Sequence, residues 1–481
     1  LRGSHSIASD VPIWPKADPM TEGHTLDSTI LRKYDIRGIV DETLSAADMR
    51  IIGRAFGSEV VRAGGKTIAT GYDGRVSSPE LVAALNEGLA ACGLSVRCIG
   101  CGPTPMLYYA SHKLATDAAA MITGSHNPAN YNGIKMVLNG RSFFDSDIQG
   151  LGKTAAAGDF ESGEGDIAEV SVAAPYIERL FEDMDFGRPL IVAWDPGNGS
   201  SGEVVRAVCD RLPGKHIVIN EKIDGTFPAH HPDPTVEENL VQLKEIVAAQ
   251  RCDLGIAFDG DGDRIGVIDE RGRVLWGDQL LALYSAEVLA DVPGAAIIAD
   301  VKASQVLFDE VARLGGKPVM APAGHSIIKA KMAETNSPLA GEMSGHIFFA
   351  HRYFGFDDAI YAALRFLSIA GRAGTSVGTM RDALPQMVNT PELRFECAES
   401  RKFSVIEEVK ERLSRMDGIS VSDIDGVRVQ TEDGWWLVRA SNTQGSLVAR
   451  CESSSAAGLT RLKATLAEQL RASNVDVPDM D

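Results

Sequence analysis

A pattern of apolar strand, aspartate, small-residue loop, helix and glycine occurs three times in this chain of 481 residues. The copies cover residues 67–93, 191–214 and 296–316. Each copy predicts one βα unit, because a short apolar run followed by turn residues and a helical pattern is typical of a strand and its crossover. The aspartates that end the strands, Asp73, Asp195 and Asp300, lie 122 and 105 positions apart. This spacing is one domain long, so we expect three similar α/β domains in a row.

Each copy continues with a second short strand and then with a third apolar segment that ends in a distinctive loop. The second strands are expected at 96–99, 217–219 and 318–321. The three loops are TGSHNP around Ser125, DGDGDR at 259–264 and GEMSGH at 341–346. In open α/β sheets the ligand crevice lies beyond the carboxyl ends of the strands. Three equivalent loops can therefore bring different reactive groups to one shared crevice.

The pattern changes beyond Pro385, where short strands at 426–431 and 435–440 alternate with helices and the helix SSAAGLTRLKATLAEQL follows. This arrangement predicts a smaller α+β domain. The fold class is thus α/β, with three consecutive mixed-sheet domains and a smaller C-terminal α+β domain around one central cleft. We place the domains at 1–171, 172–275, 276–388 and 389–481.

Charge and cysteine usage restrict the partners and the compartment. The formal charge of −19 argues against binding to a nucleic-acid backbone, and no apolar run approaches the ~18 residues of a membrane span. Seven cysteines, an odd number in a chain this long, favour a reducing compartment, which by default is the cytoplasm. Residues 1–6 (LRGSHS) resemble a vector-derived leader and are excluded from the fold argument.

Ser125 is a candidate nucleophile. The apolar run Ala118–Ile122 predicts a buried strand, and Ser125 lies on the loop that follows it, next to His126. A serine and a histidine without a third partner form a weak nucleophile signature, so an ordinary turn remains the alternative at this point.

The acidic loop is a candidate metal site. Asp259, Asp261 and Asp263 alternate with glycines, which let the backbone curl until the carboxylates converge on a hard cation such as Mg²⁺. A calcium-binding EF-hand is disfavoured because Arg264 takes the place of the required glycine and because both flanks have the pattern of strands. A solvated acidic turn is the remaining alternative.

Two further loops carry polar side chains, one pair suited to hydroxyl groups and the other set suited to an oxyanion. Glu342 and Ser344 are two residues apart, so both can hydrogen-bond sugar hydroxyls from one side of an extended loop. In the last domain a strand end is followed by donors suited to an oxyanion, namely Arg439, Ser441, Asn442 and Thr443. A simple β-turn is the alternative for the second loop.

The sequence TGSHNPANYNGIK, which begins at Thr123, resembles the phosphoserine loop of the α-D-phosphohexomutases, in particular of the bacterial phosphomannomutase/phosphoglucomutase group. The segment YDIRG at 34–38, the DGDGDR loop, the GEMSGH loop and the loop at Arg439 resemble further motifs of that family, in the family's order. The Arg439 loop departs from the commoner RASNTEP form at Gln444 and Gly445, which bears on its rigidity.

The resemblance implies a role for each of these motifs. Ser125 would carry a phosphoryl group in the resting enzyme, and metal ligands would come from Ser125, Asp259, Asp261 and Asp263. Candidates for proton transfer or charge balance are Arg37, His126, Lys135, Arg264 and His325. Implied substrate contacts are Tyr34, Lys302, Glu342, Ser344, His346, Arg439, Ser441, Asn442 and Thr443. The sequence does not assign the general base.

The implied reaction interconverts a hexose 1-phosphate and a hexose 6-phosphate of mannose, glucose or both. Mg²⁺ would be the cofactor, and a hexose 1,6-bisphosphate would be the intermediate and activator. Sugar phosphates would be the partners, with no nucleic acid or membrane, and the chain would be a cytoplasmic monomer or weak dimer. Met343 resembles the residue that the mannose and glucose mutases carry, whereas phosphoglucosamine mutases usually have Gln at this position, so the resemblance favours hexose over glucosamine. Phosphoglucosamine mutase, a metal-dependent serine phosphomonoesterase and a non-catalytic sugar-phosphate-binding protein are the alternatives.

Overall fold

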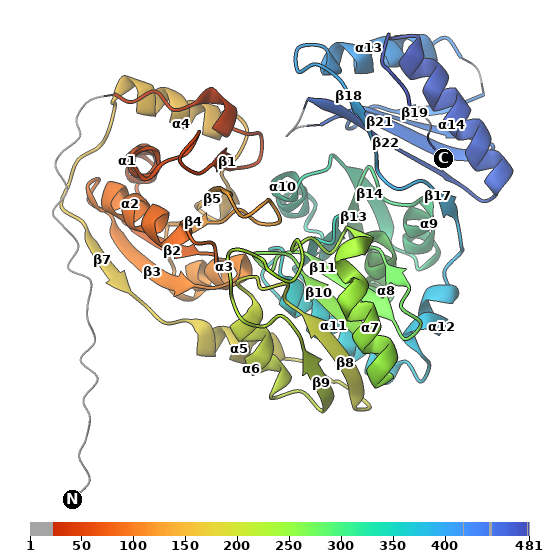
Figure 1. The fold of residues 1–481 in the computed structure, drawn as a ribbon, viewed down its shortest axis with the longest axis horizontal. Helices are drawn as coiled ribbons and strands as arrows, with labels where there is room; N and C mark the ends of the chain where they lie inside the picture. Colours follow the sequence, from red (N-terminus) through yellow and green to blue (C-terminus); the bar gives the residue numbers. More distant parts are fainter. Residues whose placement is uncertain (1–22, 417, 442–444, 479, 481) are drawn as a thin grey trace, which may run out of the picture.

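Four β-sheets follow one another along the chain, each with helices of its own (Figure 1). The structure is a computed structural model that describes residues 23–416, 418–441, 445–478 and 480. Residues 1–6, the predicted leader, and the predicted phosphate-binding residues Asn442 and Thr443 lie outside the described residues.

The first sheet has the order β1-β5-β4-β2-β3-β7, with β6 paired to β5. Its strands are β1 (Ile36–Ile39), β2 (Thr67–Tyr72), β3 (Ser95–Cys101), β4 (Ala118–Ile122), β5 (Tyr131–Leu138), β6 (Arg141–Ser142) and β7 (Asp166–Glu169). Its helices are η1 (Ser28–Ile30), α1 (Ala46–Arg62), α2 (Ser78–Ala90), α3 (Thr104–Lys113) and α4 (Ser146–Ala157). Helix α1 begins at a capping box, in which Ser45 Oγ accepts from Asp48 N and the Asp48 carboxylate accepts from Ser45 N.

The second sheet has the order β12-β11-β10-β8-β9. Its strands are β8 (Leu190–Asp195), β9 (Gly214–Val218), β10 (Leu254–Phe258), β11 (Ile265–Asp269) and β12 (Val274–Leu275). Helix α5 (Ala173–Phe181) precedes this sheet. The helices within its span are α6 (Gly202–Cys209), η2 (Glu237–Leu240) and α7 (Val241–Gln250).

The third sheet has the order β14-β13-β15-β16. Its strands are β13 (Ala296–Asp300), β14 (Lys317–Ala321), β15 (Leu339–Gly341) and β16 (Ile347–Phe349). The accompanying helices are α8 (Gly277–Asp291), α9 (Gln305–Arg313), α10 (His325–Thr335), α11 (Ala359–Arg372) and α12 (Val377–Asp382).

The three sheets share one topology. In each, the first strand of the repeat lies between the second and third strands, parallel to both, and a fourth strand runs antiparallel beside the third. The antiparallel strands are β5, β11 and β16. The predicted α/β fold with repeated mixed sheets is therefore confirmed. Each reactive loop connects the third strand to its antiparallel neighbour.

The fourth sheet is antiparallel, with the order β17-β22-β21-β20-β19 and with β18 also paired to β22. Its strands are β17 (Val388–Asn389), β18 (Leu393–Glu396), β19 (Ser420–Ser422), β20 (Val427–Thr431), β21 (Gly434–Ala440) and β22 (Ser446–Ser453). Helices α13 (Lys402–Leu413) and α14 (Ala456–Arg471) lie together beside this sheet in Figure 1. The predicted α+β architecture of this domain is confirmed.

Alternation along β21 divides its side chains between two environments. Trp436 and Val438 join the core of the C-terminal domain, whereas Trp435 and Leu437 join a small cluster with Val301 of the third domain. Successive side chains of a strand point to opposite faces, so one strand serves both its own core and the contact between domains.

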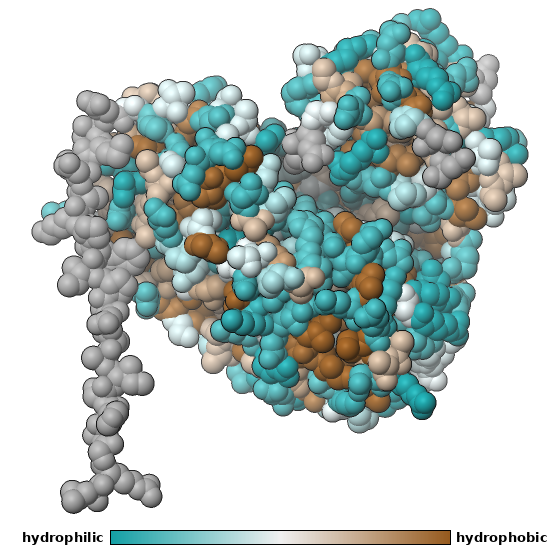
Figure 2. Space-filling model, in the orientation of Figure 1, coloured by the Kyte–Doolittle hydropathy of each residue, from teal (hydrophilic) through white to brown (hydrophobic). Residues whose placement is uncertain are grey.

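The domains surround a hollow. Figure 2 shows it between the first domain at the upper left and the C-terminal domain at the upper right, with the second and third domains below. In the described part of the chain, no helix is long and apolar enough to cross a membrane.

Candidate functional site

Ser125 lies on the loop between β4 and β5 in a conformation that few non-glycine residues adopt. Its φ is +46°, and only 3% of the residue is exposed. Ser125 Oγ donates to Asp259 Oδ2 at 2.8 Å and lies 3.2 Å from His126 Nδ1, while Ser125 N donates to Thr123 Oγ1. A left-handed backbone at a serine is held by its surroundings and is common at functional sites. The loop is thus built to hold this hydroxyl in one place.

The conformation of the loop is imposed by two buried charged residues, Asp73 and Arg75. The Arg75 guanidinium donates to four loop carbonyls at 2.5–3.0 Å, those of Ser125, Asn127, Pro128 and Tyr131. Asp73 Oδ2 accepts from the Thr123 hydroxyl and from Gly124 N. Sequence reasoning missed Arg75. A signal was available, because Arg75 lies two residues after a repeat aspartate, at the position that Lys302 takes in the third copy.

The three aspartates of the acidic loop between β10 and β11 converge as predicted. One carboxylate oxygen from each of Asp259, Asp261 and Asp263 lies within 4.8 Å of the others, and all three residues are fully buried. Oδ1 of Asp261 is buried without a hydrogen-bond partner among the described residues, and Oδ1 of Asp263 has no partner there besides its ion pair with His346. Buried carboxylates with open oxygens suit a hard divalent cation. The residues present therefore fit a metal site.

Electrostatics support the same conclusion. The pKa of Asp259 is raised well above its ordinary value, because burial disfavours the charged form and because Asp263 and Asp261 repel it. A divalent cation among these carboxylates would reverse that repulsion.

Lys135 on β5 extends from the first domain to the acidic loop of the second. Its Nζ donates to Asp261 Oδ2 at 2.7 Å and also contacts Asp263 Oδ2. Burial by itself lowers the pKa of Lys135, but these two carboxylates outweigh it and raise the pKa well above its ordinary value. Thr104, at the start of α3, also donates to Asp261 Oδ2, at 2.6 Å, and was not predicted.

Tyr34 and Arg37 flank this centre from the first domain. Arg37 lies on β1, pairs with Asp35 and donates from Nη1 to Thr123 O at 3.2 Å, behind the Ser125 loop. Tyr34 Oη reaches the third domain and donates to Ala323 O at 2.7 Å. The YDIRG segment therefore touches both the Ser125 loop and the segment between β14 and α10 of the third domain.

His346 and Arg264 connect the acidic loop to the third domain. His346 Nε2 lies 3.3 Å from Asp263 Oδ1, and its Nδ1 lies 3.1 Å from Glu342 Oε2. Burial opposes the charge on His346, but Asp263 and Glu342 raise its pKa to about 9. Arg264 Nε lies 3.4 Å from His346 Nε2, so the two residues meet at the boundary between the second and third domains.

Two other histidines, His325 and His126, have lowered pKa values, in contrast to His346. The pKa of His325 is lowered well below its ordinary value, first by burial and then by the positive charge of Lys329. Burial and Arg264 likewise lower the pKa of His126. The His325 and His346 rings stack with centroids 5.5 Å apart. The pKa values of these histidines are thus shifted in opposite directions.

The GEMSGH loop presents its two predicted polar groups differently. Glu342 is buried, and its Oε1 accepts from Gly324 N at 2.6 Å. Ser344 is partly exposed, with its Oγ 3.1 Å from His346 Nδ1. Both residues lie against His346, but Ser344 has the greater access to solvent.

Lys302 pairs with acidic groups outside the acidic loop. Its Nζ is 3.3 Å from Glu392 Oε2, on the segment that leads into the C-terminal domain, and 3.9 Å from Asp300 Oδ2. Burial, partly offset by Lys302, raises the pKa of Asp300 to about 6. The structure does not bring Lys302 into contact with the residues of the acidic loop.

Arg439 is the penultimate residue of β21 and is 7% exposed. Its Nε donates to Asp425 Oδ2 at 2.9 Å, and the same oxygen accepts from Ala323 N at 3.0 Å. Because Ala323 O accepts from Tyr34, the first, third and C-terminal domains meet at this residue. Ser441 directly follows the end of β21, and its carbonyl accepts from Lys402 Nζ at 2.6 Å.

The structure thus brings most of the predicted residues into one network. Ser125, Lys135, the three aspartates, Arg264, His346 and Glu342 are joined by successive contacts, and Tyr34 and Arg439 meet through Ala323. Such an arrangement can hold a nucleophilic hydroxyl, a divalent cation and a strongly anionic group together.

Comparison with known proteins covers nearly the whole chain. Residues 28–162, 174–272 and 276–388 match the alpha/beta/alpha domains I, II and III of the family Phosphoglucomutase/phosphomannomutase, and residues 392–469 match its C-terminal domain. All four domain families of one enzyme type therefore occur in order.

Individual relatives agree with this match. The chain is 42% identical over 454 residues to a phosphomannomutase/phosphoglucomutase of Pseudomonas aeruginosa, covering 94% of this chain and 98% of the relative. It is 39% identical over 437 residues to a phosphoglucomutase of Neisseria gonorrhoeae, covering 90% and 95%. A crystal structure of a phosphoglucomutase/phosphomannomutase family protein from Burkholderia thailandensis superposes with a TM-score of 0.90 at 41% identity, covering 94% of this chain and all of that one.

Proposed function

This chain belongs to the phosphoglucomutase/phosphomannomutase family, and we propose that it is an isomerase that interconverts the 1-phosphates and 6-phosphates of glucose, mannose or both. The observation that carries the proposal is the contact between Ser125 Oγ and Asp259 Oδ2, at 2.8 Å. This contact places a strained, buried hydroxyl beside carboxylates that fit a metal. A phosphoryl carrier needs this combination of nucleophile and charge neutralisation.

The reaction has two balanced halves. Phosphorylated Ser125 gives its phosphoryl group to O6 of a hexose 1-phosphate: the Oγ–P bond breaks, the O6–P bond forms, and the O6 proton is passed to Ser125 Oγ. The hexose 1,6-bisphosphate then reverses its orientation in the site. Its 1-phosphoryl group is transferred to Ser125 Oγ, and the proton of the Ser125 hydroxyl passes to O1. The net change is isomerisation, and the same bisphosphate acts as activator because it can rephosphorylate Ser125.

We propose Mg²⁺ as the metal, held by Asp259, Asp261, Asp263 and the group on Ser125. When bound, it supplies positive charge where negative charge develops on the transferred phosphoryl group. Lys135 balances further charge from the side of Asp261 and Asp263. Phosphorylation would add about −1.5 to −2 charges to this loop, so cations close to Ser125 are needed.

Proton transfer is proposed to involve groups already within reach. His126 Nδ1 lies 3.2 Å from Ser125 Oγ, which is hydrogen-bonding distance for a proton acceptor. Arg37, Arg264 and His325 surround the same centre and can balance charge or relay a proton.

Substrate recognition is proposed to use the third and fourth domains. Glu342, Ser344 and His346 would bind sugar hydroxyls, because all three lie on one loop beside the acidic cluster. Tyr34, Lys302, Arg439, Ser441, Asn442 and Thr443 would hold the phosphate that does not react. Because both orientations of the sugar need this grip, the C-terminal domain would act as a lid that opens for release.

We further propose a cytoplasmic monomer or weak dimer. All seven cysteines are free thiols, which agrees with a reducing compartment.

Native mass spectrometry with a product assay tests the proposal. We expect a species heavier by about 80 Da, one added HPO₃ group, that maps to Ser125. We also expect glucose 1-phosphate to become glucose 6-phosphate without release of inorganic phosphate. Release of phosphate as the main product would favour the phosphomonoesterase, binding without turnover would favour a binding protein, and preference for glucosamine phosphates would favour a phosphoglucosamine mutase.

A further inference from the structure

We propose that Arg450 and Glu452, on β22 of the C-terminal domain, position the 301–305 loop and thereby the Lys302 ammonium group for phosphate binding. The inference rests on the proposed mutase function. If it is correct, the affinity for substrate depends on the contact between the third domain and the C-terminal domain.

The loop carbonyls are held by two arginines from the C-terminal domain, Arg428 and Arg450. Arg428 Nη1 donates to Val301 O at 2.6 Å and to Ala303 O at 2.8 Å, and its guanidinium lies 3.7 Å from the centroid of the Trp435 ring. The carbonyl between these two, that of Lys302, accepts from Arg450 Nη1 at 2.5 Å. Three successive carbonyls of one loop of the third domain are therefore bonded to side chains of another domain.

Arg450 also reaches the GEMSGH loop at residues 341–346. Its Nη1 contacts Met343 Sδ, within GEMSGH, and lies 3.6 Å from Asp278 Oδ2. Only 3% of Arg450 is exposed. One buried guanidinium thus touches both segments of the third domain that the proposed mechanism uses for substrate.

The other end of the loop is held through its amides. Glu452 Oε1 accepts from Ser304 Oγ at 2.9 Å, from Gln305 N at 3.0 Å and from Trp435 Nε1 at 2.8 Å. Asp278 Oδ2 accepts from Ser304 N at 2.9 Å. Gln305 begins α9, where unpaired amides favour a carboxylate, so Glu452 fixes the point at which the loop becomes a helix.

The side chain of Lys302 also contacts the C-terminal domain. Its Nζ lies 3.3 Å from Glu392, one residue before β18. Both the main chain and the side chain of Lys302 therefore contact the C-terminal domain. Lys302 and Arg439 would accordingly act as parts of one phosphate-binding group.

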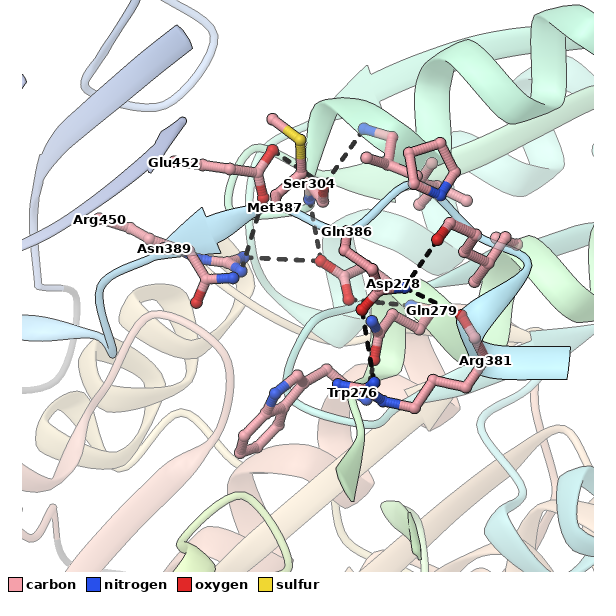
Figure 3. A pocket seen from close by; sticks show the side chains of 15 residues that line it. Trp276, Asp278, Gln279, Ser304, Arg381, Gln386, Met387, Asn389, Arg450 and Glu452 are labelled. Carbon is pink, nitrogen blue, oxygen red and sulfur yellow. Dashed lines mark hydrogen bonds and ion pairs between the residues drawn. The ribbon is translucent and has the colours of Figure 1, made fainter. Parts of the chain in front are cut away.

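The charged side chains of Arg450, Glu452 and Asp278 lie beside a small pocket. Together with Ser304, they line this pocket of about 80 Å³. Figure 3 shows Arg381 on the opposite side of this pocket from Arg450. Arg450 Nε and Glu452 Oε2 are buried there without a hydrogen-bond partner among the described residues. A buried network that is incompletely paired is not optimised for stability alone, which favours a positioning role for these charges.

The test measures kinetics with glucose 1-phosphate in Arg450→Lys, Lys302→Ala and the double variant. Arg450→Lys keeps the charge but loses the planar fork that reaches Lys302 O and Met343. We expect KM to rise about tenfold with kcat changed less than about threefold, the size of effect that coupled positions produce. Arg461→Ala, which removes an exposed ion pair with Asp433 in the same domain, is the matched control and should leave both constants unchanged.

The double variant separates positioning from simple loss of stability. If Arg450 acts through the 301–305 loop, Arg450→Lys should change KM less than twofold once Lys302 is alanine. Equal effects in both backgrounds, or an unchanged KM in Lys302→Ala, would overturn the inference. Glu452→Gln, which keeps the shape of Glu452, should also raise KM and replaces Arg450→Lys if that protein does not fold.

Failure of the proposed function gives a different result. In that case the wild-type protein itself shows no conversion of glucose 1-phosphate to glucose 6-phosphate. An active wild-type enzyme with unaltered kinetics in Arg450→Lys and Glu452→Gln would overturn the positioning role alone.

Discussion

The first three domains and the C-terminal domain are held together by different kinds of contact. One hydrophobic cluster contains residues from all three α/β domains, among them Met106, Trp194 and Phe366. The C-terminal domain has a separate core, and it meets the third domain through Trp435, Leu437 and Val301 together with buried charged groups. Shared apolar burial resists displacement more strongly than a small, partly polar interface does.

The two kinds of contact between domains correspond to two tasks, phosphoryl transfer and the binding and release of substrate. The candidate reaction centre joins the first and second domains through buried contacts such as Ser125–Asp259 and Lys135–Asp261. The proposed phosphate grip, with Arg439 and Lys302, lies on the boundary with the C-terminal domain. Transfer chemistry needs a fixed geometry, whereas substrate capture and release need an element that moves. The following predictions test this division, beginning with the largest expected effect.

Ser125→Ala should abolish mutase turnover while leaving the thermal unfolding midpoint close to that of the wild type. The hydroxyl is the proposed phosphoryl carrier and contributes little to packing. Steady-state assays and thermal scans measure both quantities. Ser162→Ala, a change on the same domain outside the centre, is the control. Substantial turnover without Ser125 would show that the rigid centre is not where transfer occurs.

Asp261→Asn should lower kcat about 100-fold or more and weaken Mg²⁺ binding, because it removes a ligand charge at nearly constant shape. Calorimetric titration with Mg²⁺ and assays after chelation check this. The exposed Asp210→Asn is a charge-matched control in the same domain. Wild-type metal affinity in Asp261→Asn would place the metal elsewhere.

Arg439→Ala should lower kcat/KM for glucose and mannose 1-phosphates equally, by about 2 to 4 kcal/mol, because a charge-assisted phosphate contact is lost. Escape of the 1,6-bisphosphate should increase as well. Arg415→Ala, an exposed change on the same domain, serves as control. If neither quantity changes, the C-terminal domain does not clamp the phosphate.

Asp358 tests how firmly the second and third domains are joined. It accepts from Tyr176 Oη on α5 and from Tyr353 Oη, yet burial raises its pKa from 3.8 to about 6. A raised pKa contributes stability that is present below pH 4 and lost as pH rises through 6. The cost of Asp358→Asn, measured by urea unfolding, should therefore shrink by about 2 to 3 kcal/mol between pH 4 and pH 7. A constant cost would contradict the raised pKa.

Glu342→Gln should impair glucose and mannose phosphates alike, by about 1 to 2 kcal/mol in kcat/KM, because an amide replaces a charge-assisted acceptor. The exposed Glu334→Gln is the control in the same domain. Loss of only one substrate would show that Glu342 distinguishes the epimers at C2.

Several features of the fold and of the candidate site were predictable from sequence. The repeated aspartates Asp73, Asp195 and Asp300 predicted three similar sheets, because strand, loop and helix are encoded by local periodicity. The alternation of Asp259, Asp261 and Asp263 with glycine predicted convergent carboxylates, because only a few neighbouring residues determine that geometry.

Contacts between distant segments were decided by the tertiary structure. Lys135 meets Asp261, Arg75 grips the carbonyls around Ser125, and Arg450 holds Lys302 O; none of these pairs shares a local pattern. Lys302 also shows the limit of a motif, since its side chain is directed to Glu392 rather than to the acidic loop. Periodicity fixes which face of an element is buried, whereas the partner of a long charged side chain depends on how whole domains pack.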